Sequence, residues 1–346
     1  MIILLTDRQL LILKTIIDDF IETAHPVGSR IISKKKNISY SAATIRNVMA
    51  DLEEMGLIEK THSSSGRIPS EKGYRYYVDH VIAPSIHAQD VQVIKHMIQD
   101  GFFEFEKMVQ MSAQVLSDLT NYTTIILGPE VNETKLKQVE IIPLSNQAAV
   151  AILITNTGHV EHRSFTIPKG VSTSDIEKLV NILNDRLKNV PLIHVSDKLI
   201  TEVHELINRY INNSEKLFEY LKVALAHDDS VKLYVGGKSN MLTQPEFRDV
   251  EKVHSFFSMM EREDEIAELL KNKEEGLNVT IGNENTLEAI KNFSLITASY
   301  HLGKEQVGII GLLGPTRMEY KKVITLLNAL SNEMTEALYR WYKNGQ

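Results

Sequence analysis

The segment YSAATIRNVMADLEEMGLIEK, residues 40–60, decides how the first part of the chain folds. Ser41 is a suitable N-cap, because its hydroxyl can accept a hydrogen bond from a free N–H of the first helical turn. Gly56 suits the left-handed position that ends a helix. Between them, apolar residues recur at three- and four-residue steps: Ile45, Val48, Met49, Leu52 and Met55. Residues 41–56 are therefore predicted to form an amphipathic helix.

The opposite face of this helix carries side chains suited to reading DNA. They are Ala43, Arg46, Asn47, Ala50 and Glu54. An arginine can recognise guanine and an asparagine can recognise adenine, and small residues let a helix approach the bases closely. An ordinary amphipathic surface helix has the same periodicity, so this helix alone does not decide between the two interpretations.

The flanking residues favour the DNA-binding interpretation. A second helix is predicted from residue 28 to about residue 36, in the order that a helix-turn-helix requires. Its candidates for phosphate contacts are Ser29, Arg30, Lys34, Lys35 and Lys36. After Gly56, residues 57–60 are predicted to form a strand, and a return strand begins at Arg67. The predicted wing that touches the DNA backbone or the minor groove consists of His62, Ser63, Ser64, Ser65, Gly66 and Arg67. The sequence thus predicts a winged helix-turn-helix.

The charge distribution agrees with this assignment. The chain of 346 residues has a formal net charge of −7. Residues 26–75, however, hold nine Lys and Arg against five Asp and Glu, a local charge of +4, whereas residues 84–346 carry −8. A local positive field is what phosphate contact needs. There is no cysteine, which excludes disulfides, thiol catalysis and cysteine-ligated zinc.

The remaining pattern predicts an α+β chain with several domains. A Thr6–Gln9 capping box opens a scaffold helix that ends near Pro26, and residues 83–90 are predicted to be a linker. One long helical pattern covers residues 91–120. Strands are predicted at 123–127, 136–143, 148–155, 160–167, 277–281, 295–300 and 307–313. They flank a mainly helical block at roughly 170–250, which predicts an antiparallel sheet domain with a helical insertion.

Motifs for catalysis, cofactors, metals and membranes are weak or missing in the sequence. Gly237, Lys238 and Ser239 resemble the end of a phosphate-binding loop, but Lys232 stands where that motif needs glycine, so a tight turn is the better interpretation. His159 and His162 lack carboxylates at metal-site spacing. No apolar run approaches the roughly 20 residues that span a bilayer, and no signal peptide is evident. We therefore expect a cytoplasmic protein that is not an enzyme and has no cofactor or metal.

The sequence resembles the HrcA family of heat-inducible transcription repressors. The resemblance rests first on TDRQLLILKTIIDDFIETAHPVGSR at residues 6–30 and on YSAATIRNVMADLEEMGLIEKTHSSSGRIPSEKGYRYYVD at residues 40–79. It continues in YVGGKSNML and QPEF at 234–247, VTIGNEN at 279–285 and GIIGLLGPTRMEYKKVI at 308–324. One departure is the order of Thr61, His62 and Ser63, where the family has His-Thr-Ser; we expect it to affect the wing contacts only slightly.

The resemblance implies a winged helix-turn-helix DNA-binding domain at residues 1–83. It further implies a GAF-like domain at 91–170 and 251–346, and an inserted, mostly helical dimerisation domain at 171–250. Such a repressor acts as a homodimer on an inverted-repeat operator in double-stranded DNA, the CIRCE element, and is kept active by the GroE-type chaperonin. The bases would be read by Ala43, Thr44, Arg46 and Asn47, beside the wing at 63–67.

Two other functions remain open at this point. A winged-helix regulator that senses a small molecule through the GAF-like domain has the same DNA-binding sequence. An enzyme or chaperone-binding adaptor with an unused helix-turn-helix is the third possibility. The operator sequence, the controlled genes, the derepression temperature, the chaperonin-contacting surface and any ligand of the GAF-like domain do not follow from the sequence.

Overall fold

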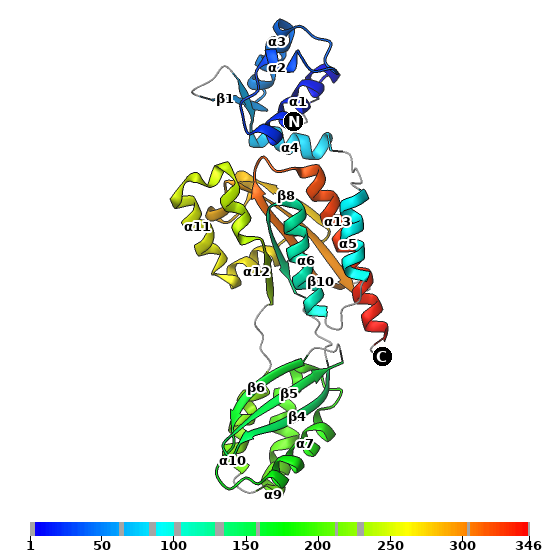
Figure 1. Cartoon of the computed structure of the whole chain (residues 1–346), viewed down its shortest axis with the longest axis vertical. Helices are drawn as coiled ribbons and strands as arrows, with labels where there is room; N and C mark the ends of the chain where they lie inside the picture. Colours follow the sequence, from blue (N-terminus) through cyan, green and yellow to red (C-terminus); the bar gives the residue numbers. More distant parts are fainter. Residues whose placement is uncertain are drawn as a thin grey trace.

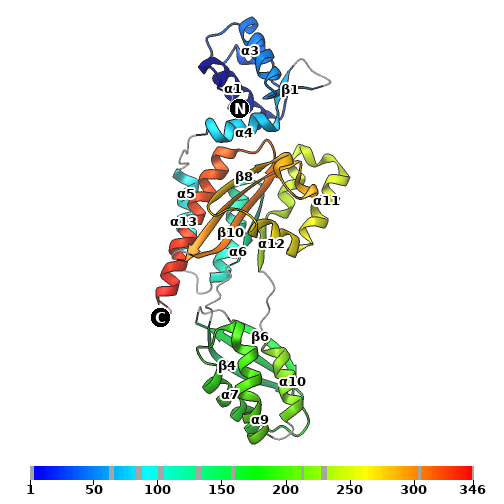
Figure 2. The same cartoon turned by 180° about the vertical axis from the view of Figure 1, so that it is seen from behind.

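The computed structural model describes residues 4–61, 66–82, 88–99, 105–128, 135–156, 160–211, 214–226, 232–302 and 305–344. The chain forms three units arranged along one long axis (Figure 1). We call residues 4–82 the N-terminal unit, residues 88–128 with 232–344 the body, and residues 135–226 the inserted unit. The body lies in the middle, and Figure 2 shows the same order from behind. No helix in these ranges has the length and apolar character needed to cross a membrane.

The N-terminal unit consists of helices followed by a small hairpin. In chain order it contains α1 (Asp7–Thr23), α2 (Ser29–Ile32), α3 (Ala42–Glu54), β1 (Ile58–Lys60), β2 (Arg67–Pro69) and α4 (Glu71–His80). The predicted capping box of α1 is present, since Thr6 and Gln9 each accept a hydrogen bond from the other's backbone N–H. β1 and β2 pair antiparallel, with Glu59 opposite Ile68. The predicted order of elements is confirmed.

Helix α2 is shorter than predicted, because it ends at Ile32 instead of near residue 36. A turn follows, in which the N–H of Lys34 donates to the carbonyl of Ile31 over 3.2 Å. Residues 33–36 are Ser-Lys-Lys-Lys, so another helical turn would bury no apolar side chain.

The body is built on a five-stranded antiparallel sheet in the order β7-β3-β10-β9-β8. The strands are β3 (Thr123–Leu127), β7 (Leu233–Gly236), β8 (Leu277–Ile281), β9 (Phe293–Leu302) and β10 (Glu305–Pro315). Successive side chains point to opposite faces, so Ile125 and Ile126 enter different hydrophobic clusters. Both faces of this sheet are therefore covered.

Helices form the two outer layers of the body. One face is packed against α5 (Ala88–Gln99), α6 (Phe105–Thr120) and α13 (Tyr320–Asn344). The other carries α11 (Val250–Met260), α12 (Glu263–Lys271) and the 3₁₀ turns Lys238–Thr243, Pro245–Arg248 and Glu288–Ile290. A further 3₁₀ turn, Gly282–Glu284, follows β8. The single helix predicted over residues 91–120 is wrong: α5 and α6 are separate helices packed against each other.

The inserted unit has its own three-stranded antiparallel sheet, ordered β4-β5-β6. It contains β4 (Leu136–Ser145), β5 (Ala148–Thr155), β6 (Val160–Thr166), α7 (Thr173–Leu187), α8 (Leu192–Lys198), a π-helical turn (Leu199–Val203), α9 (His204–Tyr210) and α10 (Ser214–Ala224). The helices cover one face of the sheet, as Figures 1 and 2 show from opposite sides. Side chains from that face, such as Val139 and Leu153, share a core with Leu179 and Leu183 of α7.

This packing corrects the predicted limits of the insertion, which were residues 171 and 250. β4 to β6 were assigned to the GAF-like part, yet they pack with α7 to α10 in a core separate from that of the body. β7 was assigned to the insertion, yet it pairs with β3 in the sheet of the body. Sequence periodicity locates strands, but it does not say which strands share a sheet.

Candidate nucleic-acid interface

Helix α3 is fixed at both ends by the residues that the sequence singled out. The hydroxyl of Ser41 accepts a hydrogen bond from the N–H of Thr44 over 3.1 Å, which caps the first turn. Gly56 has a φ of 72°, a left-handed conformation that favours glycine. Ile45, Val48, Met49 and Leu52 are buried and join the core with α1. One face of α3 is therefore held firmly, which fixes the direction of the other.

The opposite face of α3 is open to solvent. Ala43, Arg46, Asn47 and Ala50 are exposed, as predicted for residues that approach DNA bases. Thr44 is half-buried, and its hydroxyl lies 2.9 Å from that of Ser41. Ser41 and Thr44 thus form the cap, and the four exposed residues form what we call the reading face. It lies at the end of the molecule far from the inserted unit (Figure 1).

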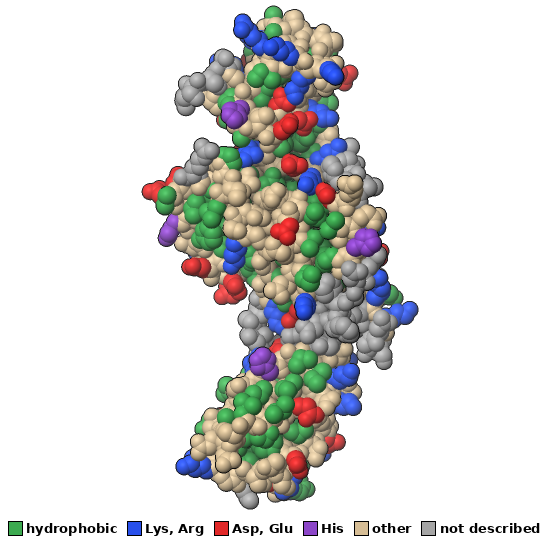
Figure 3. All heavy atoms as spheres, viewed as in Figure 1, with side chains coloured by type: hydrophobic (Ala, Val, Ile, Leu, Met, Phe, Trp, Pro, Cys, Tyr) green, Lys and Arg blue, Asp and Glu red, His purple; other side chains and the backbone are tan. Residues whose placement is uncertain are grey.

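The basic residues around α2 divide into two kinds. Arg30, Lys34 and Lys36 are exposed beside the reading face, where they can meet phosphates. Lysine and arginine side chains are visible at this end of the molecule (Figure 3). Lys35 instead forms an ion pair with Asp19 of α1, a residue that is itself buried. Lys35 therefore holds α2 against α1, and Ser29, also predicted to contact phosphate, is half-buried.

The predicted wing is only partly described. His62, Ser63, Ser64 and Ser65 lie outside the described residues. Gly66 is buried against Pro26, so no larger side chain fits there.

Arg67 belongs to the base of the hairpin and not to an exposed tip. Its side chain is only 14% exposed, and its Nε and Nη2 lie 2.9 and 2.7 Å from Oε2 of Glu53 on α3. Its backbone exchanges two hydrogen bonds with Val27. Arg67 thus ties the hairpin to α3 and to the segment before α2.

Two contacts that sequence reasoning missed complete the unit. Nζ of Lys72 donates to the carbonyl of Met55 over 2.8 Å and so satisfies the C-terminal end of α3. The hydroxyl of Tyr77 donates to Asp18 over 2.7 Å and ties α4 to α1. Burial, with a further contribution from that hydrogen bond, raises the pKa of Tyr77. Neither pair has a sequence signal, because the partners are 17 and 59 residues apart.

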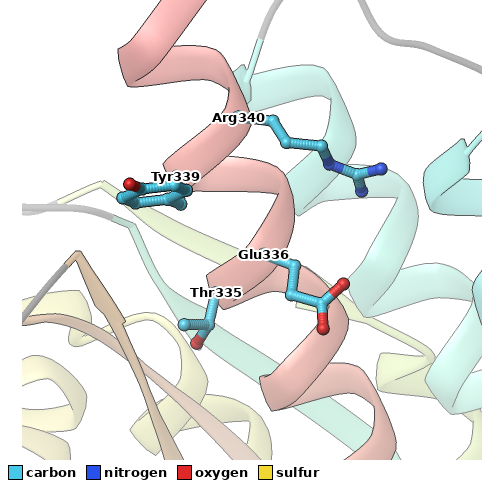
Figure 4. Close-up of a pocket in the computed structure, with 4 residues that line it drawn as sticks. All are labelled: Thr335, Glu336, Tyr339 and Arg340. Carbon is cyan, nitrogen blue, oxygen red and sulfur yellow. The ribbon is translucent and has the colours of Figure 1, made fainter.

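Two depressions lie elsewhere on the surface. One, of about 490 Å³, is lined by Thr335, Glu336, Tyr339 and Arg340. All four come from α13, and their side chains point to different sides of it (Figure 4). The other, of about 590 Å³, lies in the inserted unit beside the turn between β4 and β5. Polar groups in a ligand site converge on one point. The side chains that line the first depression do not converge (Figure 4), so we do not assign a ligand to it.

Comparison with known proteins finds a structure of similar fold and relatives of similar sequence. A solved structure described as that of a hypothetical protein at 2.2 Å resolution superposes with a TM-score of 0.75 at 23% identity, covering 98% of this chain and all of that one. A relative from Oceanobacillus iheyensis, named heat-inducible transcription repressor HrcA, is 61% identical over 340 residues, which are 98% of this chain and 99% of the relative. The family model described as the HrcA protein C-terminal domain matches residues 106–324. The chain belongs to the HrcA family.

Proposed function

We propose that the chain is a repressor of heat-shock operons that binds an inverted-repeat operator, the CIRCE element, through α3. The observation that carries this proposal is the reading face, which presents an arginine, an asparagine and two alanines on a helix capped at both ends. The name of the 61% identical relative supports the repressor function.

The fold of each unit can be interpreted in the same terms. The order of α2, α3, β1 and β2 supports a winged helix-turn-helix, in which the second helix enters the major groove. We assign the body to a GAF-like domain, and the inserted unit, residues 135–226, to the dimerisation domain. The proposed wing lies between β1 and β2 in the sequence, and Arg67, at the start of β2, is joined to Glu53 of α3.

The sheet of the inserted unit supports a homodimer. Helices cover one of its faces, and the other face is rich in hydrophobic side chains (Figure 3). Strand pairing places on that outer face Ile142, Val150, Ile152, Ile154 and Val160. Ile142 is 49% exposed and Val160 is 47% exposed. Glu140 and His162 flank Ile152 on the same face. An exposed apolar patch with polar neighbours marks an interface, and a two-fold contact through it would match the two-fold symmetry of an inverted repeat.

Support by a GroE-type chaperonin is the regulatory part of the proposal. If heat depletes the folded dimer, a chaperonin that refolds it restores the DNA-competent form by mass action. Unfolded client proteins that occupy the chaperonin would then relieve repression. The resemblance to the family is what suggests this step.

The test is operator binding by the full chain as a function of temperature, with and without purified chaperonin and ATP. We expect tight binding to an inverted repeat, weak binding to a duplex with one scrambled half-site, and recovery of heat-lost binding only when chaperonin is present. Equal affinity for the two duplexes would contradict the operator assignment. Recovery without chaperonin would contradict the regulatory part alone.

A further inference from the structure

The N-terminal unit is fixed to the body by directional contacts. Arg75 of α4 donates from Nε to Oε1 of Glu284 over 2.9 Å, and its Nη2 contacts Oε2 of the same carboxylate. Nη2 also donates to the carbonyl of Val279 at 2.7 Å. A two-point contact between a guanidinium and a carboxylate fixes orientation as well as distance. We call the contacts between α4 and residues 279–284 the seam.

A second pair extends the seam along α4. The carboxylate of Glu71 accepts hydrogen bonds from the backbone N–H of Asn283 at 3.1 Å and from its Nδ2 at 3.1 and 3.3 Å. Gly282, which precedes Asn283, has a φ of 55°. A methyl group at Gly282 would overlap the Glu71 carboxylate. Glu71 and Arg75 lie one helical turn apart, so both contacts come from one face of α4.

A third contact holds the unit from a different helix. Nη1 of Arg317 donates to the carbonyl of Ile21 in α1 over 3.3 Å. The same guanidinium is held within the body by Glu246, at 2.5 Å, and by Gln244, at 3.1 Å. The ring of Tyr74 packs against that of Tyr320, with centroids 5.8 Å apart. Contacts from α1 and from α4 together resist rotation of the unit as well as its separation.

The seam sets how α3 is oriented relative to the inserted unit of the same chain. Helix α3 and the sheet of the inserted unit lie towards opposite ends of the molecule (Figure 1). If two chains join through their inserted units, the distance and rotation between the two α3 helices depend on how each N-terminal unit sits on its body. That relation must match the separation of the operator half-sites, which sets the geometry of a dimeric reader.

We propose that Arg75 and Glu71 are positioning residues that restrict the dimer to one half-site spacing. The inference rests on the proposed function. One added base pair moves a half-site by about 3.4 Å and turns it by about 35°. A fixed seam does not follow this change, whereas a released N-terminal unit does. Releasing the seam therefore relaxes spacing selectivity without changing which bases α3 recognises.

The experiment uses the full-length dimer and three duplexes that differ in spacing: the operator, and operators with the spacer one base pair longer or shorter. An operator with one base change inside a half-site and a scrambled duplex serve as references. Equilibrium Kd values are measured at one salt concentration for wild type, Arg75→Ala, Glu71→Gln and Asp79→Asn. Asp79 is the control, because its carboxylate pairs with Nη1 of Arg75 within α4 and, among the described residues, makes no hydrogen bond or ion pair with the body. Melting temperature and sedimentation establish that each variant is folded and dimeric, and Glu71→Gln is the milder variant if Arg75→Ala fails to fold.

The expected result is that wild type and Asp79→Asn prefer the native spacing, while the seam variants lose at least about fivefold of that preference. Their discrimination against a base change inside a half-site stays the same. An unchanged spacing preference, or an equal loss of affinity on all three duplexes, would overturn the inference. The inference would also be overturned if the wild-type protein bound the operator with the same affinity at all three spacings. A wild type that fails to distinguish the operator from scrambled DNA would instead contradict the proposed function.

Discussion

The two ends of the molecule leave opposite kinds of surface uncovered. In the N-terminal unit the apolar residues of α3 are buried. Its first turns expose an arginine, an asparagine and small residues beside exposed Lys34 and Lys36, and its later turns expose Asp51 and Glu54. In the inserted unit, helices cover one face of a sheet and leave the aliphatic side chains of the other in water. A polar face suits a hydrated polyanion, whereas an apolar face is stabilised by a second apolar surface. The uncovered surface thus indicates the kind of partner at each end.

The largest expected effect comes from placing a charge on the apolar end. We expect Ile152→Asp to dissociate the proposed dimer, because Ile152 lies on the outer face of the central strand and an unpaired carboxylate buried in an apolar contact is costly. Operator affinity should then fall by about 10²- to 10⁴-fold, since the gain from linking two half-site contacts is lost. Sedimentation velocity and gel shift measure the two effects. Ile200→Asp is the control, because Ile200 is 45% exposed in the helical layer. A dimer that survives Ile152→Asp places the interface elsewhere.

A second prediction separates base recognition from phosphate contact in the N-terminal unit. We expect Arg46→Ala or Asn47→Ala to reduce discrimination between the operator and single-base variants by about 1–3 kcal/mol. Lys36→Ala should instead weaken binding to all sequences alike and lower the salt dependence by about one counterion. Fluorescence anisotropy at several salt concentrations separates the two patterns. Equal losses on every duplex for Arg46→Ala would remove its reading role.

A third prediction concerns the N-terminal cap of α3 and its contribution to the free energy of unfolding. Ser41→Ala removes the hydrogen bond to the N–H of Thr44, so we expect the free energy of unfolding to fall by about 1 kcal/mol. Urea unfolding followed by circular dichroism measures the change. Ser41→Asp is the control, because aspartate also caps well and should keep most of the stability. If both variants lose the same stability, the cap is not the cause.

A smaller effect is expected at the joint between the N-terminal unit and the body. The buried hydroxyl of Tyr74 has no hydrogen-bond partner among the described residues. Tyr74→Phe should therefore leave the free energy of unfolding unchanged or raise it by up to about 1 kcal/mol. Tyr77→Phe is the matched comparison, because it removes the hydrogen bond to Asp18 and should cost about 1 kcal/mol. A loss of stability in Tyr74→Phe would mean that the hydroxyl does have a partner.

Tyr74 also makes the stability of the folded chain depend on pH, but only at alkaline pH. Burial, followed by the nearby Tyr320, raises the pKa of Tyr74 well above its ordinary value. The unfolded phenol releases its proton near pH 10, so stability that is present below about pH 10 is lost as the pH rises further. We expect Tyr74→Phe to lose less stability than wild type between pH 9 and about 11, as measured by thermal melts. Parallel curves for the two proteins would contradict this assignment.

The sequence predicted local features well and long-range pairing poorly. The cap at Ser41, the left-handed Gly56 and strands such as β3 and β8 depend on neighbours in the chain, and they lie where predicted. Arg67 was assigned to the wing and Lys35 to phosphate contact, because each is a cation in a basic segment. Their ion pairs with Glu53 and Asp19 join residues 14 and 16 positions apart, which no periodicity specifies. Whether a cation is available to DNA depends on such tertiary partners.

After the inserted unit, the chain returns to the sheet of the body at β7 and pairs with β3. This arrangement bears on the origin of the fold and on how the chain folds. β3 and β7 are antiparallel neighbours, and the N–H of Gly128 donates to the carbonyl of Lys232 over 2.8 Å. They therefore form a hairpin whose turn has been replaced by a folded module. A few residues could close the same hairpin, so we expect the pairing of β3 with β7 to survive replacement of the module by a short turn. In folding, the module must bring its own ends together early, or the two strands must close a very long loop.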